Sequence, residues 1–319
     1  MSDQLPPTGA DDDAAQEPEA APANVLSFKA RAAPGAGGLG GDIATFAAMG
    51  AHGLPVVATL VMRDTAEVFD QHVIEADAVA EQARTVLEDI SIAAWKVGFL
   101  GSAENVSAVA EILSDYPDVP LVAYMPAVGW MDEDEHGAYL DAYRELILPS
   151  AEVLVGNQKT LTDFLLPEWD SERPPSTREL AVAAAEHGAR HVLVTGIVLP
   201  ARAQEGFIDN VLSSASGAIC GEKFERFEAS FLGAGETLSA ALAALLASGA
   251  DLPSAVSEAL SFLDQSLDAG FRPGMGQVVP DRFFWAVPPE DEGEEGDEPF
   301  GGPGGLEDPG QARGPKRMH

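Results

Sequence analysis

Cysteine and basic residues are both scarce in this chain. Cys220 is the single cysteine among 319 residues, which excludes an intrachain disulfide framework and a zinc site built from several cysteines. Lys and Arg number 18 against 52 Asp and Glu, and the net charge is −34. Such a balance excludes nonspecific nucleic-acid binding, which needs a basic surface, and argues against adhesion to anionic membranes. No stretch approaches the ~18 apolar residues of a membrane span.

The two ends of the chain differ in composition from its middle. Residues 1–24 contain no Lys or Arg and no long apolar run, so they lack the features of a secretory signal. We therefore expect a cytoplasmic protein with a disordered acidic head at 1–24. Residues 288–319 mix acidic runs with Gly and Pro, a composition that buries too little apolar area to offset chain entropy. They are predicted to form a disordered tail, with one folded domain at 25–287.

Candidate strands and helices alternate along the middle of the chain. The continuous Val-rich run at 54–61 is typical of a parallel strand buried on both faces. Alternation of this kind predicts an α/β fold with a doubly wound parallel sheet, whose ligands bind beyond the carboxyl ends of the strands. Other strands are predicted at 24–28, 94–100, 120–125, 152–155 and 191–195, with a late antiparallel pair at 206–212 and 223–231. Helices are predicted at 42–51, 75–87, 103–113, 135–146, 177–187, 234–246 and 253–269.

A glycine-rich loop at 34–41 lies between the first strand and the first helix. It contains the spacing Gly35-x-Gly37-x-x-Gly40, in which glycines permit close approach of the backbone to a ligand. The dinucleotide fingerprint also requires an acidic residue at the end of the next strand, which is missing, and there is no Walker A Lys-Ser/Thr. A tight turn with no ligand is therefore the alternative interpretation.

A second glycine loop opens the helix at 234–246. It reads Gly233-Ala234-Gly235-Glu236-Thr237-Leu238-Ser239. Free N–H groups at a helix start form an anion site, and a phosphoryl group in transfer would suit it. Glu236 could then point toward the reacting centre. The alternative is that Glu236 only complements the dipole of its own helix.

This helix start resembles the signature of the hydroxymethylpyrimidine/phosphomethylpyrimidine kinases of the ribokinase superfamily, which are related to the pyridoxal kinases. The family has Gly-Thr-Gly-Cys-Thr-Leu-Ser-Ala-Ala here, and pyridoxal kinases have Asp in place of Cys. Segments 41–53, 96–100 and 274–276 also match in family order. The resemblance implies a ribokinase-like three-layer α/β/α fold with a mostly parallel central sheet. It also implies ATP-dependent phosphorylation of a hydroxymethylpyrimidine, its phosphate or a related heteroaromatic alcohol, in thiamine biosynthesis or salvage.

The resemblance also assigns roles to residues. ATP and Mg²⁺ are the expected cofactors, a small molecule the expected substrate, and a homodimer the expected assembly. Glu236 would take the proton of the substrate hydroxyl, replacing the family's Cys or Asp, while the amides of Gly233, Ala234 and Gly235 hold the phosphoryl group. The nucleotide-side positions are Asn157, Thr195 and Gly196. The substrate-side positions are Gly37, Asp42, Arg63 and Phe99.

Several polar positions of the family pattern are changed in this chain. The Gln that reads the pyrimidine amine falls at Arg63, and a bulky cation there predicts a different ring preference. The Asp-Pro motif becomes Tyr124-Met125, the Glu of Asn-x-x-Glu becomes Thr160, and Lys-Gly-Gly begins here with Thr195. The residues name no metal ligand. These losses keep an alternative function open, in which the chain is a catalytically impaired pseudokinase that acts as a ligand-binding or regulatory protein.

Overall fold

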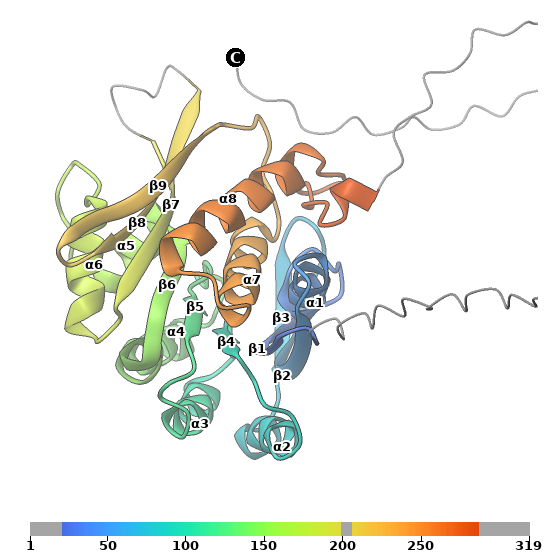
Figure 1. The fold of residues 1–319 in the computed structure, drawn as a ribbon. Coiled ribbons are helices and arrows are strands. Elements are labelled where there is room, and N and C mark those ends of the chain that lie inside the picture. The colour runs from blue at the N-terminus through green and yellow to red at the C-terminus, as the bar shows by residue number, and fades with distance from the viewer. Residues whose placement is uncertain (1–20, 199–205, 287–319) are drawn as a thin grey trace, which may run out of the picture.

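A single mixed sheet forms the centre of the protein (Figure 1). The computed structural model describes residues 21–198 and 206–286, and within them nine strands are ordered β3-β2-β1-β4-β5-β6-β7-β8-β9. Neighbouring strands from β2 through to β7 pair in parallel, and the edge pairings β2–β3, β7–β8 and β8–β9 are antiparallel. The strands are β1 (Asn24–Ala32), β2 (His52–Arg63), β3 (Val68–Val73), β4 (Ala94–Val97), β5 (Leu121–Tyr124), β6 (Ala151–Asn157), β7 (His191–Ile197), β8 (Phe207–Ser214) and β9 (Gly217–Glu225).

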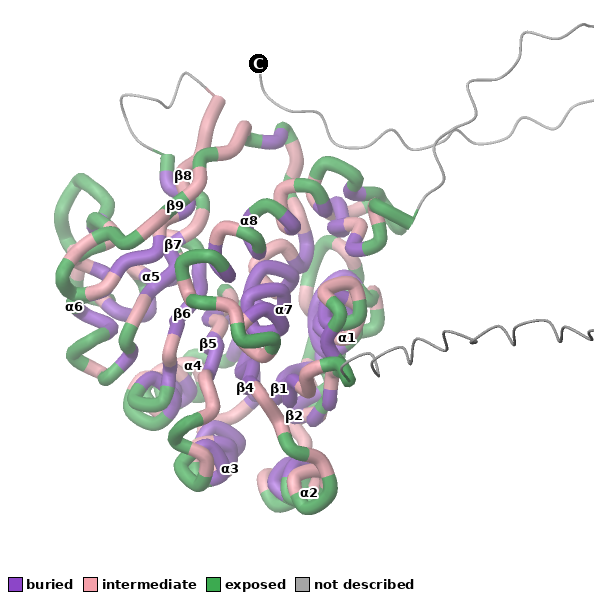
Figure 2. Tube along the Cα trace, viewed as in Figure 1, coloured by how far each residue is buried: buried purple, intermediate pink, exposed green. Residues whose placement is uncertain are grey.

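Helices cover both faces of the sheet, as the sequence predicts. α1, α7 and α8 pack on one face, and α2 to α6 pack on the other (Figure 1). α7 is buried continuously over residues 237–245, because the sheet, α1 and α8 enclose it (Figure 2). The helices are α1 (Gly38–Ala48), α2 (Ala76–Leu87), α3 (Ala103–Ser114), α4 (Glu133–Ala142), α5 (Gln158–Leu165), α6 (Thr177–Glu186), α7 (Ala234–Ala247) and α8 (Leu252–Asp268).

The start of α1 differs from the prediction. The helix begins at Gly38, whereas the sequence predicts Asp42. The end of the glycine loop therefore forms the first helical turn, and a Glu236 carboxylate oxygen accepts a hydrogen bond from the Gly38 amide there. One consequence is that Asp42 lies inside the helix and faces the sheet, where it is fully buried.

Three further elements depart from the prediction. β3 was not expected, because its sequence Val-Phe-Asp-Gln-His-Val is polar, half exposed and confined to the sheet edge. α5 is only eight residues long, too short for a clear helical periodicity. The last strand is β9 at Gly217–Glu225 rather than 223–231, because a tight turn with Gly217 at φ 138 pairs it directly with β8.

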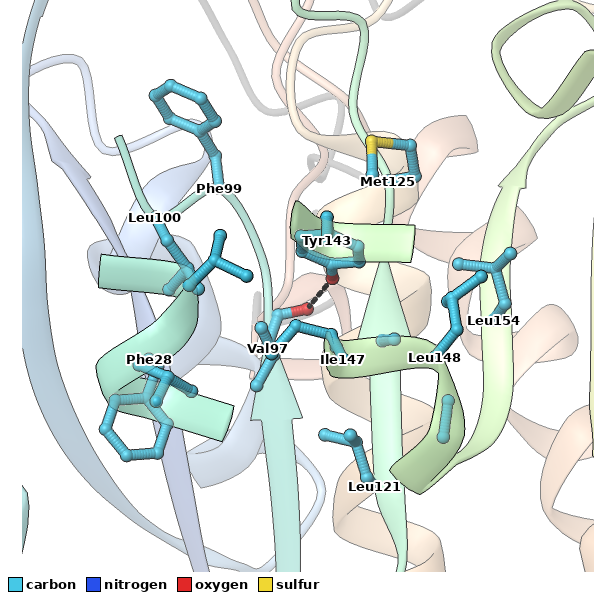
Figure 3. Packing of buried hydrophobic residues seen from close by; sticks show 14 of the residues in the cluster. Phe28, Val97, Phe99, Leu100, Leu121, Met125, Tyr143, Ile147, Leu148 and Leu154 are labelled. Carbon is cyan, nitrogen blue, oxygen red and sulfur yellow. Dashed lines mark hydrogen bonds between the residues drawn. The ribbon is translucent and has the colours of Figure 1, made fainter. Parts of the chain in front are cut away.

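The core on the α2–α6 side holds the end of β4 in place. Figure 3 shows Tyr143 pointing toward Val97, and its hydroxyl donates a hydrogen bond to the Val97 carbonyl at 3.2 Å. The hydroxyl of Tyr139 accepts a hydrogen bond from the Leu100 amide at 3.2 Å. Burial raises the pKa of both phenols, so both stay protonated. Together they fix the segment that carries Phe99.

Nearly all of the described residues fall within the predicted folded domain at 25–287. β1 begins at Asn24, and the predicted head and the predicted tail at 288–319 fall almost wholly outside what the structure describes. No helix in 21–198 or 206–286 is long and apolar enough to cross a membrane.

Candidate active site

A cavity lies where the first parallel strands end, at the edge of the sheet that the α/β topology predicts for ligands. Its volume is about 90 Å³. The ends of β1 and β2, the first turns of α1 and α7, and the loop from Pro126 to Trp130 surround it. We call it the Glu236 cavity, because Glu236 from the first turn of α7 lines it together with Gly37, Arg63 and Phe99.

The Glu236 carboxylate lies between the starts of two helices. It belongs to the first turn of α7, and its Oε1 accepts a hydrogen bond from the Gly38 amide of α1 at 3.2 Å. The Lys29 ammonium is 3.1 Å from the same oxygen. The absence of a side chain at Gly37 makes room for the Glu236 carboxylate, because a Cβ there would lie 1.9 Å from Glu236 Oε2. Glu236 thus complements the dipole of α1 as well as that of its own helix.

Behind Glu236 lies a buried cluster of charges. Asp42 accepts hydrogen bonds from Lys29 at 3.1 Å, from Ser27 at 2.8 Å and from Lys96. Lys96 also donates to the backbone carbonyl of Glu236 at 3.2 Å. Two lysines thus face two carboxylates inside the protein. We call Lys29, Asp42, Lys96 and Glu236 the buried quartet.

The quartet fixes the ionisation of the cavity's carboxylate. Burial by itself would raise the pKa of Glu236, but the charges of Lys29 and Lys96 and the two hydrogen bonds outweigh it and lower the pKa to about 2. Burial would lower the pKa of Lys29, yet Asp42 and Glu236 raise it overall. Burial lowers the pKa of Lys96 to about 7, although Asp42 opposes the shift. Glu236 is therefore an anion at neutral pH and a weak base.

The first turn of α7 offers free backbone donors. Gly233 has φ 91, no side chain caps the helix, and among the described residues no acceptor pairs with the amides of Gly233, Ala234 or Gly235. The Tyr124 hydroxyl lies against this turn, since a Cβ on Gly235 would be 2.7 Å from it. These amides form the start of an anion site, as the sequence predicts.

Arg282 ties the two glycine loops together. Its Nε donates a hydrogen bond to the Thr237 hydroxyl at 3.1 Å, and its Nη2 donates to the Ala36 carbonyl. The side chain is 5% exposed. The starts of α1 and α7 are therefore held beside each other, which places Gly37 against Glu236.

The predicted substrate-side residues separate into two groups. Gly37, Arg63 and Phe99 line the Glu236 cavity, and Trp130 packs on Phe99 with ring centroids 5.2 Å apart. Asp42 does not line the cavity and reaches it only through Lys29. Its role in the structure is to hold two lysines behind the cavity wall.

The predicted nucleotide-side residues lie together on neighbouring strands. Asn157 and Thr195 are paired in the register of β6 and β7, and Gly196 follows with φ 67. The Asn157 side chain accepts a hydrogen bond from the Thr160 amide at 2.8 Å and so caps α5. None of the three lines the Glu236 cavity. The segment 199–205 after β7 lies outside the described residues.

A magnesium site built from protein carboxylates does not fit the residues present. At the two positions where the family resemblance implies carboxylates, this chain has the hydroxyl groups of Tyr124 and Thr160, and the Tyr124 phenol stays neutral because burial raises its pKa. Among the described residues, no group of three His, Cys, Asp or Glu is placed to hold a metal ion.

Sequence reasoning assigned no site role to Lys29, Lys96 or Arg282, which are all part of this site. Lys29 carries a detectable signal, because a lysine within the apolar strand Asn24–Ala32 must find buried partners. Arg282 carries none, since only the fold brings it from the end of the domain to the two helix starts.

The sheet, its layers and the helix-start site define a ribokinase-like fold of the kind found in small-molecule kinases. The structure of an ADP complex of Bacillus subtilis pyridoxal kinase superposes with a TM-score of 0.73, covering 83% of this chain and 99% of that chain at 22% identity. At that identity the likeness shows the fold alone.

Sequence similarity defines the family. The phosphomethylpyrimidine kinase family model matches residues 33–281, so the chain belongs to this family. A hydroxymethylpyrimidine/phosphomethylpyrimidine kinase of Streptomyces coelicolor is 29% identical over 279 residues, covering 86% of this chain and 98% of that protein. The enzyme of the same name from Mycobacterium tuberculosis (strain ATCC 25618 / H37Rv) is 32% identical over 273 residues, covering 81% and 93%. These relatives are phosphotransferases that act on an alcohol, and the sequence-based prediction of the family is confirmed.

Proposed function

We propose that this protein transfers the γ-phosphoryl group of ATP to the hydroxymethyl group of a hydroxymethylpyrimidine or a related heteroaromatic alcohol, or to the phosphate group of a hydroxymethylpyrimidine phosphate. The observation that carries the proposal is that free backbone N–H donors and the Glu236 carboxylate lie together at the start of α7. Glu236 lines the cavity, and the unpaired amides of Gly233, Ala234 and Gly235 begin the same helical turn. A ring in the cavity would place its hydroxyl beside Glu236 and its incoming phosphoryl beside those amides.

The low pKa of Glu236 is compatible with transfer. Phosphoryl transfer passes through a loose transition state in which the protein mainly positions the reactants and stabilises charge. An ionised Glu236 orients the substrate hydroxyl as a hydrogen-bond acceptor and accepts its proton late, when the oxygen has become acidic. The quartet keeps this carboxylate charged and fixed in place. The role of Glu236 as proton acceptor stays a prediction.

ATP supplies the transferable phosphoryl group. Amides at the start of α7 would stabilise the negative charge that spreads over its oxygens. The Tyr124 hydroxyl, which lies against Gly235, is a further donor in reach of this turn. Asn157, Thr195 and Gly196 are proposed to contact the nucleotide from the ends of β6 and β7. No step is assigned to Mg²⁺, because the residues that the structure describes do not form its site.

Release of ADP that depends on an added alcohol tests the function. We expect release with at least one of the pyrimidine or pyridoxal alcohols, and Glu236→Gln should lower the rate about 100-fold because the hydroxyl loses its charged acceptor. The matched control is Glu104→Gln, an exposed glutamate in the first turn of α3, which should leave the rate unchanged.

The same assay distinguishes the proposed kinase activity from the alternative function as a pseudokinase. Binding of an alcohol without ADP release, when a known kinase turns over in the same buffer, would contradict the proposal and favour a ligand-binding pseudokinase. A homodimer and a cytoplasmic location remain predictions that rest on the resemblance and on the sequence. Sedimentation of the purified chain tests the first.

A further inference from the structure

Arg63 brings an incompletely paired guanidinium into the Glu236 cavity. It ends β2, is half-buried, and its Nε donates a hydrogen bond to the Asp64 carbonyl at 3.1 Å. Among the described residues, no acceptor pairs with its two terminal nitrogens. Burial lowers the pKa of Arg63 while Glu236 and Asp64 oppose the shift, so the cation is partly dehydrated and still charged. The planar fork formed by these two nitrogens therefore has N–H donors available for a hydrogen-bond acceptor on a ligand.

The walls around this fork suit a flat ring. Phe99 and Trp130 meet edge to face, and Val61 and Val68 add apolar surface. The cavity volume of about 90 Å³ is several times the ~15 Å³ that one water needs, which gives room for a single ring. A ring held between these walls, with its hydroxymethyl group at Glu236, turns another edge toward Arg63.

A guanidinium discriminates between the edges that a ring can present. It has five N–H donors and no acceptor, so it pairs well with ring oxygens and cannot pair with an amino group. Lys29 also lines the cavity, so its charged lining residues are Lys29, Arg63 and Glu236. An amino edge offers one ring nitrogen as an acceptor and sets its own N–H donors against the guanidinium of Arg63, so the fork loses one of its two hydrogen bonds, which is costly.

We propose that the Glu236 cavity selects a ring alcohol whose edge facing Arg63 carries oxo oxygens rather than an amino group. This specificity rests on the proposed function, because it assumes that the acceptor alcohol occupies this cavity. It makes Arg63 the residue that determines which ring is taken.

Calorimetric binding without ATP tests the specificity. 5-Hydroxymethyluracil and 4-amino-5-hydroxymethyl-2-methylpyrimidine both carry a hydroxymethyl group on a pyrimidine ring but differ in the neighbouring edge. We expect the uracil compound to bind wild-type protein at least ~10-fold more tightly, the size of effect that one charged hydrogen bond supplies. Equal binding of the two rings, tighter binding of the aminopyrimidine, or no binding of either would overturn the inference.

Variants locate the preference at Arg63. Arg63→Gln offers both a donor and an acceptor, so the preference should fall at least ~5-fold. Arg63→Lys keeps the charge without the fork and should lose most of the preference as well. Arg31→Gln removes the same charge from an exposed position on β1 outside the cavity and should keep the wild-type preference. A preference that survives Arg63→Gln, in protein with unchanged thermal unfolding, would overturn the inference.

Transfer measurements separate this inference from the proposed function. An Arg63-dependent preference for the uracil compound, with no phosphorylated product from any ring, would uphold the specificity and refute the kinase activity. Tighter binding and phosphorylation of the aminopyrimidine would uphold the activity and refute the specificity.

Discussion

Glu236 and Lys29 form the contact on which the site depends. Glu236 is 19% exposed and Lys29 is 1% exposed, so their attraction is only weakly screened by water. Lys29 is also shared with Asp42, so removing it leaves two carboxylates with fewer partners. Buried pairs of this kind need not stabilise a fold more than apolar residues would, but breaking one is expensive.

The fall in unfolding free energy at acid pH should report the lowered pKa of the Glu236 carboxyl group. Its pKa falls from an ordinary 4.5 to about 2 on folding, so between these pH values the unfolded chain binds a proton and the folded chain does not. The contribution is complete above pH 4.5 and is lost as pH falls to about 2. It amounts to about 3 kcal/mol. Glu236→Gln should therefore flatten the fall in unfolding free energy over this range, measured by denaturant titration. Parallel curves for the two proteins would refute the shift.

Coupling between Lys29 and Glu236 can be measured by a double-mutant cycle. Lys29→Met alone should lower the free energy of unfolding by about 3 kcal/mol. In the double variant Lys29→Met/Glu236→Gln, the loss of unfolding free energy should be ~1–2 kcal/mol smaller than the sum of the two single losses. The exposed pair Arg84–Glu111 provides the comparison, and its coupling should stay below ~1 kcal/mol. Equal coupling in both pairs would contradict the burial argument.

At the scale of elements, the contact between the starts of α1 and α7 positions the site. Gly233 has φ +91, and a Cβ there would lie 1.9 Å from the Ala36 carbonyl oxygen. Arg282 bridges the same two segments. The glycine loops are therefore packed against each other, and each makes room for the other's backbone or carboxylate.

A pair of glycines at the two ends of α7 tests this packing. Gly233→Ala combines an unfavourable φ with a backbone clash. Gly249 has a similar φ of +87, but a Cβ added there would have no atom within 4 Å, so Gly249→Ala has the unfavourable φ alone. The conformational cost of ~1–2 kcal/mol should be common to both. Gly233→Ala should be less stable than Gly249→Ala by at least a further ~2 kcal/mol in denaturant unfolding. Similar losses in the two variants would show that the loops are not in close contact.

The sequence predicts much of this arrangement and misses the rest for identifiable reasons. Strands such as β2 and β6 follow from continuous apolar runs, and the start of α7 follows from its glycine motif. The early start of α1 could not be predicted, because its first turn is glycine-rich and its Gly38 amide bonds to Glu236, which is 198 positions away in sequence. The same holds for Arg282, whereas Lys29 could have been found from its place in an apolar strand.

On the scale of the whole molecule, charge repulsion opposes folding. A net charge of −34 in 319 residues destabilises the compact state through repulsion between carboxylates at the surface. Salt screens exposed charges, with a screening length that falls from ~10 Å at 0.1 M to ~3 Å at 1 M. The midpoint of thermal unfolding should therefore rise with NaCl concentration over this range. A constant or falling midpoint would contradict this view of the surface.

The repulsion also bears on substrate capture. An anionic nucleotide is repelled at long range, so its binding depends on local donors such as the amides at the start of α7 and the cations of the cavity.

Transfer of a labelled γ-phosphoryl group from ATP to a hydroxymethyl ring compound is the most direct measurement of the central claim. The account predicts labelled alcohol phosphate with wild-type protein and with Glu104→Gln, and about 100-fold less with Glu236→Gln. Label that stays on ATP with every ring compound shown to bind, or that is transferred equally well by Glu236→Gln, would contradict it.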